Sequence, residues 1–397
     1  MTSPPSIHGT VAPGFEPVAE TFVENFRRRD ELGAACAAYL EGEKVVDLWG
    51  GFRTVACSGP WTEDTLVLVF STTKGMAATA VAHARSNGLF EYDDTVATHW
   101  PAFGQNGKDE ITIRELLAHQ GGVAAPRRKL NPERIADTET LSSMLASKRP
   151  EWTPGRRHGY HSFTLGWYES ELIRRTDPAG RTLGQYFADE IAAPLDAEFY
   201  VGLPDDVSRN RIAEIDGYSV AEIVTHIRQF PWRMVLSLLS PRSLSSRALD
   251  CFEIDSPADL DRPSYRSVEI PSGNGIGRVR DIAEIYGMLA TDGGNLDIGT
   301  DTLDELRRPA NPPRQGPEDL VLKTESAYSL GYSKPSSNFR FGRSTAAFGT
   351  PGAGGSFAFA DPDEGLGFAY APNRMKPRLW DDPRERALRN ALYDCLD

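Results

Sequence analysis

The feature that most limits what this chain can fold into is an apolar run that passes directly into a helical pattern, at Ser71-Thr72-Thr73-Lys74. The five residues before it, 66–70, are all apolar and predict a buried segment. The residues after it, 75–87, predict a helix that ends at a glycine. Positions three apart lie on one face of a helix, so Ser71 and Lys74 are expected to be neighbours. A serine hydroxyl needs a nearby base to act as a nucleophile, and a lysine amine can be that base.

The tetrad alone also fits a plainer interpretation, in which Ser71 caps a helix and Lys74 points into solvent. The seven histidines of the chain show no metal-ligand spacing, and no G-x-S-x-G sequence is present. His119 and His161 are therefore interpreted as structural. The catalytic interpretation of the tetrad depends on what accompanies it elsewhere in the chain.

Two later motifs fit the same chemistry. Tyr160 is predicted to lie in a loop just before a helix, 162–176, where it could pass a proton if a nearby ammonium lowered its pKa. A lone tyrosine is more often a packing residue. The segment 349–356 is rich in glycine and leads into a predicted strand. Its backbone N–H groups could approach a ligand closely, as an oxyanion hole requires, although a plain turn would also fit.

Taken in order, S-x-x-K, Y-x-S at 160–162 and the glycine-bearing strand motif resemble the serine β-lactamase and penicillin-binding protein superfamily. The closest resemblance is to family VIII carboxylesterases, which are esterases with a class C β-lactamase fold. It covers nearly the whole chain. The segments that carry it, besides these motifs, are 116–122, 152–155, 194–195, 272–275 and 348–361.

The resemblance implies a role for each motif residue. Ser71 would be the acylated nucleophile, Lys74 its base, and Tyr160 would complete the proton relay. Whether Lys74 as a neutral amine or Tyr160 as a phenolate takes the serine proton stays open. The oxyanion hole would be formed by the backbone N–H groups of Ser71 and Ala353, without a metal or an organic cofactor. Substrate contacts are implied for Ser162, Thr350 and Gly352.

One departure from the family pattern bears on the substrate. Thr350-Pro351-Gly352 stands where β-lactamases have Lys-Thr-Gly, whose first two residues help to hold a substrate carboxylate. Thr350 brings no charge, and Pro351 has neither a hydroxyl nor an N–H. The sequence therefore favours small, neutral esters with short acyl chains over β-lactams.

The predicted fold is α+β, because strand patterns occur at both ends of the chain and helical patterns in the middle. The resemblance makes it a class C β-lactamase-like fold, with an antiparallel sheet flanked by helices. Residues 1–90 and 320–397 are expected to form a split domain that carries the sheet. Residues 91–319 are expected to form a mainly helical inserted domain, with the active site in the cleft between the two. Within that insertion, 240–270 is rich in Ser, Pro and Asp and is expected to be a long surface excursion.

Finer patterns predict individual elements. Apolar residues at 18, 22 and 26 predict an amphipathic helix, and 383–396 predicts a closing one. Two hairpins are predicted, one joining 33–40 to 44–49 and the other joining 355–360 to 367–371. Strand patterns also occur at 328–333.

Composition limits the partners and the compartment. The 397 residues carry a formal net charge of −13, which argues against nucleic acid or an anionic membrane surface as the main partner. No apolar run is long enough to span a bilayer, and the first twenty residues lack a signal-peptide pattern. With four scattered cysteines and no C-x-x-C pair, the expected compartment is the cytoplasm.

Other functions remain open on the same scaffold. The chain could be a β-lactamase, a peptidase or amidase acting on D-amino-acid substrates, or an acyltransferase. From a different class, it could be a ligand-binding protein that has kept the fold without catalysis. The presence of Ser71, Lys74 and Tyr160 together argues against that last possibility. The sequence does not indicate an oligomeric state.

Overall fold

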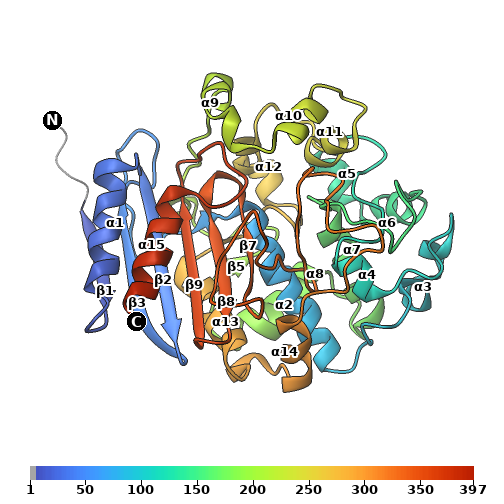
Figure 1. Cartoon of the computed structure of the whole chain (residues 1–397), viewed down its shortest axis with the longest axis horizontal. Coiled ribbons are helices and arrows are strands. Elements are labelled where there is room, and N and C mark those ends of the chain that lie inside the picture. Colours follow the sequence, from blue (N-terminus) through green and yellow to red (C-terminus); the bar gives the residue numbers. More distant parts are fainter. Residues whose placement is uncertain (1–5) are drawn as a thin grey trace.

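The frame of the molecule is a six-stranded antiparallel sheet built from both ends of the chain (Figure 1). The computed structural model describes residues 6–397. The strand order is β1-β3-β2-β9-β8-β7, so the first and last segments of the chain meet in the middle of the sheet. The strands are β1 (Ile7–Val11), β2 (Gly33–Leu40), β3 (Glu43–Gly51), β7 (Phe348–Pro351), β8 (Phe357–Asp361) and β9 (Leu366–Pro372). The predicted α+β class with an antiparallel sheet is confirmed.

Both predicted hairpins are confirmed. In the first, β2 and β3 are joined by Glu41 and Gly42, which have φ angles of +50° and +82°. Two successive residues with positive φ make the kind of tight turn whose twist matches antiparallel strands. In the second, β8 pairs with β9 along its whole length. Strand β9 pairs in turn with β2, from Leu366 opposite Leu40 to Pro372 opposite Ala34.

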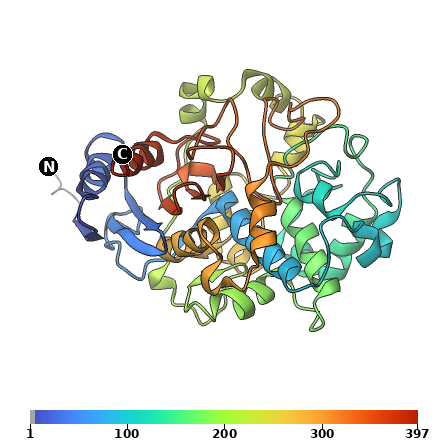
Figure 2. The same ribbon diagram turned by 60° about the horizontal axis from the view of Figure 1, so that its bottom comes forward.

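Helices cover both faces of the large sheet (Figure 2). Helices α1 (Glu16–Arg28) and α15 (Pro383–Asp394) lie on one face, where Phe22 and Leu388 pack with strand residues such as Phe368. Both were predicted from their apolar spacing. Helix α13 (Val279–Ala290) lies against β2, β8 and β9. It falls within the predicted inserted range 91–319 but packs on the sheet, and the division into two domains stays a prediction.

The middle of the chain is mainly helical, with a small three-stranded sheet in the order β4-β6-β5. Its strands are β4 (Val67–Leu68), β5 (Phe199–Tyr200) and β6 (Ile276–Gly277). The remaining helices are α2 (Thr73–Ser86), α3 (Val96–His99), α4 (Ile113–Leu117), α5 (Pro132–Ala136), α6 (Thr138–Ala146), α7 (Thr164–Thr176), α8 (Leu183–Phe187), α9 (Val220–Thr225), α10 (Trp232–Leu238), α11 (Leu244–Leu249), α12 (Pro263–Arg266) and α14 (Thr300–Arg307). None of the helices within residues 6–397 is both long and apolar enough to cross a bilayer.

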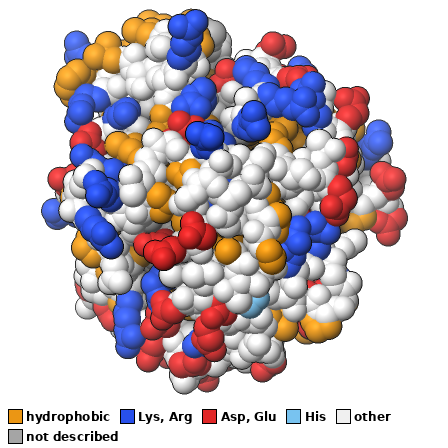
Figure 3. Space-filling view, turned by 90° about the vertical axis from the view of Figure 1, so that its right-hand side faces the viewer, with side chains coloured by type: hydrophobic (Ala, Val, Ile, Leu, Met, Phe, Trp, Pro, Cys, Tyr) orange, Lys and Arg blue, Asp and Glu red, His pale blue; other side chains and the backbone are white. Residues whose placement is uncertain are grey.

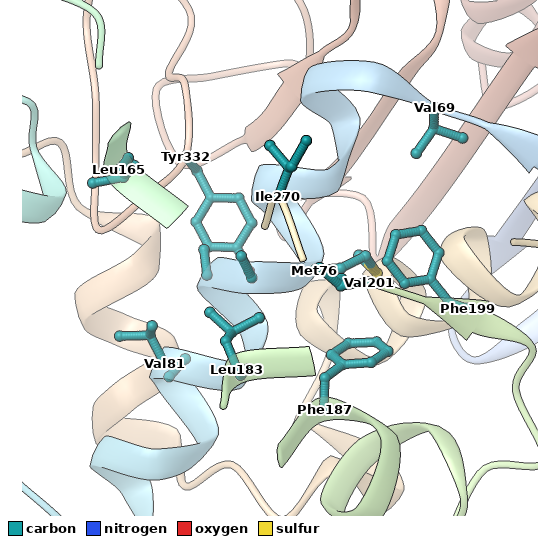
Figure 4. Packing of buried hydrophobic residues seen from close by; sticks show 14 of the residues in the cluster. Val69, Met76, Val81, Leu165, Leu183, Phe187, Phe199, Val201, Ile270 and Tyr332 are labelled. Carbon is teal, nitrogen blue, oxygen red and sulfur yellow. The ribbon is translucent and has the colours of Figure 1, made fainter. Parts of the chain in front are cut away.

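Helix α2 runs through the centre of the molecule and is buried on all sides. Twelve of its fourteen residues are buried. Met76 and Val81 lie among side chains from several other elements, such as Phe199 (Figure 4). Small residues in this helix let other segments of the chain approach closely: a Cβ on Gly75 would lie 1.9 Å from the Tyr286 hydroxyl. The polar groups within this helix, such as Lys74, are therefore shielded from bulk water.

Two expectations from the sequence differ from the structure. The segment 240–270 is not only a surface excursion, since Cys251, Phe252 and Leu260 are each 1% exposed. Its apolar residues pack inward although serine, proline and aspartate dominate its composition. The segment 328–333 forms no strand, only two isolated bridges, one between Tyr328 and Ser333 and one between Ser333 and Gly349.

Candidate active site

Ser71 lies in a single tight turn, η1 (Phe70–Thr72), between β4 and α2. The residue before it, Phe70, has a φ of +49°, a conformation that is costly for a bulky side chain. The Thr73 hydroxyl donates to the Phe70 carbonyl and accepts from the Gly275 N–H at 2.8 Å. These contacts hold the turn in a shape that its sequence alone would not favour.

The turn is also tied to the strand motif at the far end of the chain. The Ser356 hydroxyl donates to the Val69 carbonyl at 2.8 Å, and the Thr72 hydroxyl lies 3.1 Å from the Ser356 oxygen. A Cβ on Gly352 would lie 2.4 Å from the Val69 carbonyl oxygen. Only glycine therefore allows this close approach. Gly352 does not line the pocket described below.

Lys74 faces Ser71 from the first turn of α2. Its Nζ lies 3.1 Å from Ser71 Oγ, and it donates to the carbonyls of Ser162 at 2.6 Å and Ser272 at 2.8 Å. The residue is 1% exposed, and this burial lowers the pKa of Lys74 to about 7. Close to neutral pH, a large fraction of Lys74 is thus an uncharged amine.

Tyr160 lies beside both residues. Its ring centroid is 4.9 Å from Lys74 Nζ, and it shares the pocket with Ser71. Burial raises the pKa of Tyr160 to about 12; a hydrogen bond with Ser71 lowers it in part, and the charge of Asp319 raises it. Tyr160 is therefore a neutral phenol at physiological pH.

Two buried histidines hold the loop that carries Tyr160. His161 accepts the Val123 N–H on Nε2 at 3.1 Å and bonds the Gly159 carbonyl through Nδ1 at 2.7 Å. The His161 backbone N–H donates to His119 Nδ1 at 3.0 Å. Burial lowers the pKa of His161 to about 3 and that of His119 well below its usual value. Both imidazole rings are neutral and form hydrogen bonds with nearby backbone groups, as a structural role requires.

The remaining predicted site residues are only partly brought together. Ser71, Ser162 and Ala353 share the pocket with Tyr160. The backbone N–H groups of Ser71 and Ala353 have no acceptor within residues 6–397. Thr350 does not reach the pocket: it is 2% exposed, and its hydroxyl lies 3.5 Å from the Tyr286 hydroxyl on the core side of β7.

The pocket above Ser71 encloses about 330 Å³ and is lined mainly by apolar side chains. The lining comes from segments far apart in the sequence, chiefly 218–260, 322–339 and 378–380. Among the lining residues are Ile223, Phe230, Met234, Phe252 and Trp380. Sequence reasoning missed this chamber, because nothing in the separate segments marks them as neighbours. Arg378 also lines it, and its guanidinium has no ion-pair partner in the described part of the chain.

Two further groups beside Lys74 were missed. The Ser272 carbonyl, a backbone atom, leaves no trace in the sequence pattern. Glu169 on α7 is 1% exposed, and neither of its carboxyl oxygens has a hydrogen-bond partner among the described residues. Burial raises the pKa of Glu169 to about 8, and the charge of Lys74 lowers it in part. No group of three or more side chains suited to hold a metal ion occurs within residues 6–397.

Comparisons with known proteins agree with this fold. A family model described as beta-lactamase matches residues 18–392. The chain is 32% identical over 384 residues to the esterase/beta-lactamase LipL of Mycobacterium tuberculosis, covering 93% of this chain and 83% of LipL. It is similar to a crystal structure of a family VIII carboxylesterase, with a TM-score of 0.85 and 35% identity over 98% of this chain and all of that one. A penicillin-binding protein homologue from Caulobacter crescentus matches with a TM-score of 0.81 and 32% identity, over 98% of this chain and all of that one.

Proposed function

This chain belongs to the beta-lactamase family, as its resemblance to class C β-lactamase-like esterases predicted, and we propose that it is a serine hydrolase of small carboxylic esters. In this proposal the reaction passes through an acyl-enzyme on Ser71. The observation that carries it is the 3.1 Å contact between Lys74 Nζ and Ser71 Oγ at the floor of an apolar pocket. A serine hydroxyl and a buried amine at that distance are the parts of an activated nucleophile.

The contacts of Lys74 support its role as the base. A neutral amine has two N–H donors and one lone pair. The two donors match the carbonyls of Ser162 and Ser272, which leaves the lone pair facing Ser71 Oγ. A pKa of about 7 makes the neutral form available near physiological pH. Tyr160, with a pKa of about 12, is rarely a phenolate there. The geometry thus favours Lys74 over Tyr160 as the acceptor of the serine proton.

The proposed reaction has two stages, acylation of Ser71 and hydrolysis of the acyl-enzyme. Ser71 Oγ forms a bond to the ester carbonyl carbon, and its proton passes to Lys74. The backbone N–H groups of Ser71 and Ala353 stabilise the negative oxygen of the tetrahedral intermediate. The C–O bond to the alcohol then breaks, and the proton returns through Tyr160 to the leaving oxygen. A water molecule then adds to the acyl carbon and gives a proton to Lys74. The bond between the acyl carbon and Ser71 Oγ breaks, the proton returns to Ser71 Oγ, and the acid is released. The residues named here need no metal or cofactor for these steps.

Ester substrates are favoured by the surroundings of Ser71. The pocket lining is mainly apolar, and Thr350 and Pro351 bring no charge to it. A neutral ester can enter such a pocket without leaving a carboxylate buried and unpaired. The names of the relatives point the same way, since one is a carboxylesterase and another an esterase/beta-lactamase.

One observation favours a second candidate function, the hydrolysis of β-lactams. Arg378 lines the same pocket as Ser71, and its guanidinium has no carboxylate partner within residues 6–397. It could hold the carboxylate of a β-lactam in place of the missing lysine. The pocket would then accept both neutral esters and β-lactams, with esters as the better substrates.

The decisive experiment compares p-nitrophenyl butyrate with nitrocefin on the wild type, Ser71→Ala and Ser162→Ala. Ser71→Ala should lose more than nine-tenths of ester turnover, and a fluorophosphonate label should map to Ser71 by mass spectrometry. Ser162→Ala is the matched control, because it removes another serine side chain of the pocket but keeps the carbonyl that Lys74 contacts. It should still be labelled.

Three results would count against the proposal. Labelling of another serine would displace Ser71 as the nucleophile. No turnover of either substrate and no labelling would favour a binding protein. Nitrocefin turnover equal to that of the ester would make β-lactams the primary substrates.

A further inference from the structure

The outer surface above the pocket exposes an unusual amount of apolar side chain. Of the seven large hydrophobic side chains exposed within residues 6–397, six lie between 224 and 239. Leu239 is 77% exposed and Trp232 70% exposed. We call this group the roof patch; it consists of Val224, Ile227, Trp232, Leu236, Leu238 and Leu239. Figure 3 shows hydrophobic side chains gathered at the top of the molecule, the end at which Figure 1 places α9 and α10.

The same segment is apolar on its inner side. Ile223, Phe230 and Met234 line the pocket above Ser71. Leu238 belongs to both the roof patch and the pocket lining, since it lines the pocket and is 40% exposed. A helix at the surface of a soluble protein usually turns a polar face outward, whereas α10 exposes Trp232, Leu236 and Leu238. The roof patch therefore continues, through Leu238, into the chamber that holds Ser71.

The segment that carries the roof patch has a net charge opposite in sign to that of the whole chain. Residues 219–243 contain three arginines, Arg228, Arg233 and Arg242, against one glutamate, Glu222, while the chain carries −13. Arg228 and Arg242 are exposed, and Arg233 is paired with Glu318. At physiological salt, charges are screened beyond about 8 Å, so a docking surface is sensitive mainly to the charge close to it.

We propose that the roof patch docks on an anionic lipid surface, and that apolar esters pass from that surface beside Leu238 into the pocket. A Trp and aliphatic side chains, with arginines beside them, are the composition of segments that lie in a membrane interface without spanning it. The docking does not depend on the chemistry proposed for Ser71. For the proposed esterase, the lipid surface would be the source of water-insoluble ester substrates.

A second copy of this chain is the rival occupant. A two-fold interface through the roof patch would bring the same patch of two molecules together. In such a dimer, Arg228 and Arg242 of one copy would lie close to the same arginines of the other copy. Glu222 is the one carboxylate that each patch would bring to offset them. The charge distribution therefore fits an anionic surface better than a copy of itself.

The test is flotation with lipid vesicles, using the Ser71→Ala protein so that hydrolysis cannot complicate binding. The probes are vesicles of phosphatidylcholine alone and vesicles containing one third phosphatidylglycerol. Trp232→Ser/Leu236→Ser/Leu239→Ser removes three of the six side chains of the patch without touching the pocket lining. Val55→Ser is the matched control, because Val55 is the one large exposed hydrophobic residue outside the patch among those described.

The expected result is binding to the phosphatidylglycerol vesicles that the triple variant reduces at least about tenfold and Val55→Ser leaves unchanged. Arg228→Gln/Arg242→Gln should weaken this binding and reduce its dependence on salt, whereas Arg27→Gln/Arg28→Gln on α1 should not. In the Ser71-containing background, the triple variant should cleave a water-soluble ester at the wild-type rate.

Three outcomes would overturn the proposal. One is no binding to either vesicle. Another is binding that the triple variant leaves intact. The third is a dimer in sedimentation that the triple variant dissociates while vesicle binding is absent, which would assign the roof patch to a second copy of the chain.

Discussion

The hydroxyl of Ser356 donates a 2.8 Å hydrogen bond to the carbonyl of Val69, and this bond joins two parts of the chain almost three hundred residues apart. Val69 precedes the turn that presents Ser71, and Ser356 follows the glycine-rich segment that presents Ala353. The two N–H groups proposed as the oxyanion hole therefore sit on segments that Ser356 links. Their spacing depends on a residue that need not touch the substrate.

Ser356→Ala is expected to lower kcat by about tenfold to a hundredfold, less than the complete loss of an oxyanion donor. The free energy of unfolding should fall by only about 1 kcal/mol, the usual worth of one hydrogen bond. Kinetics with p-nitrophenyl butyrate and thermal unfolding measure the two effects. Ser142→Ala is the control, since this buried serine donates to the Glu171 carboxylate and neither residue lines the pocket. Equal losses of kcat in both variants would show that the effect is general destabilisation.

The pH dependence of kcat/KM distinguishes the two possible bases. A protonated Lys74 has no lone pair, so activity should be low in acid and rise to a plateau with a midpoint near 7. If the Tyr160 phenolate were the base, activity would keep rising towards pH 12. Glu169 is largely protonated near this midpoint, because its own pKa is raised to about 8, so Glu169→Gln should move the midpoint only slightly and towards lower pH. Rates measured from pH 5 to 11 test both statements.

Lys74→Ala and Tyr160→Phe should each lower kcat by about a hundredfold to ten-thousandfold, with smaller effects on KM. Both residues bond Ser71, and in the proposed relay they pass the same proton. The double variant should be little worse than the poorer single one, because groups that act as one unit are not additive. Losses that simply multiply would mean that the two residues work independently.

Arg378→Gln should lower the kcat/KM for nitrocefin about tenfold to a hundredfold, the worth of a hydrogen bond to a charged group. The same change should affect p-nitrophenyl butyrate far less, because that ester carries no carboxylate. Lys376→Gln serves as the control, since Lys376 pairs with Asp30 and does not line the pocket. Equal losses on both substrates would remove Arg378 as a carboxylate contact, and a wild type inert to nitrocefin would remove the second candidate function.

The elements that the sequence predicted well are those with a local physical signal. The β2–β3 hairpin depends on a two-residue turn, Glu41-Gly42, and helix α1 on apolar residues spaced four positions apart. The neighbourhood of Ser71 and Lys74 follows from helical spacing. In each case the residues that determine the structure lie within a few positions of one another.

What could not be predicted depends on contacts between distant segments. Thr350 belongs to a recognisable motif, but the pleat of β7 turns its side chain towards Tyr286 in the core. Phe252 lies in a stretch whose serines and prolines suggested a surface loop, yet the chain folds it inward to line the pocket. The lowered pKa of Lys74 arises from burial by the whole fold, which no local pattern contains.

The pairing of β2 with β9 has a consequence for how the molecule comes into being. A ribosome delivers Ala34 long before Pro372, its partner across the centre of the sheet. Until then β2 has β3 on one side and an open edge on the other, which is a site for mispairing with other chains. Closure over such a separation carries a large entropic cost and makes slow folding the rule for this topology. Ser71 and Ala353 can meet only after residue 353 has been made, so the proposed oxyanion hole cannot form in any shorter nascent chain.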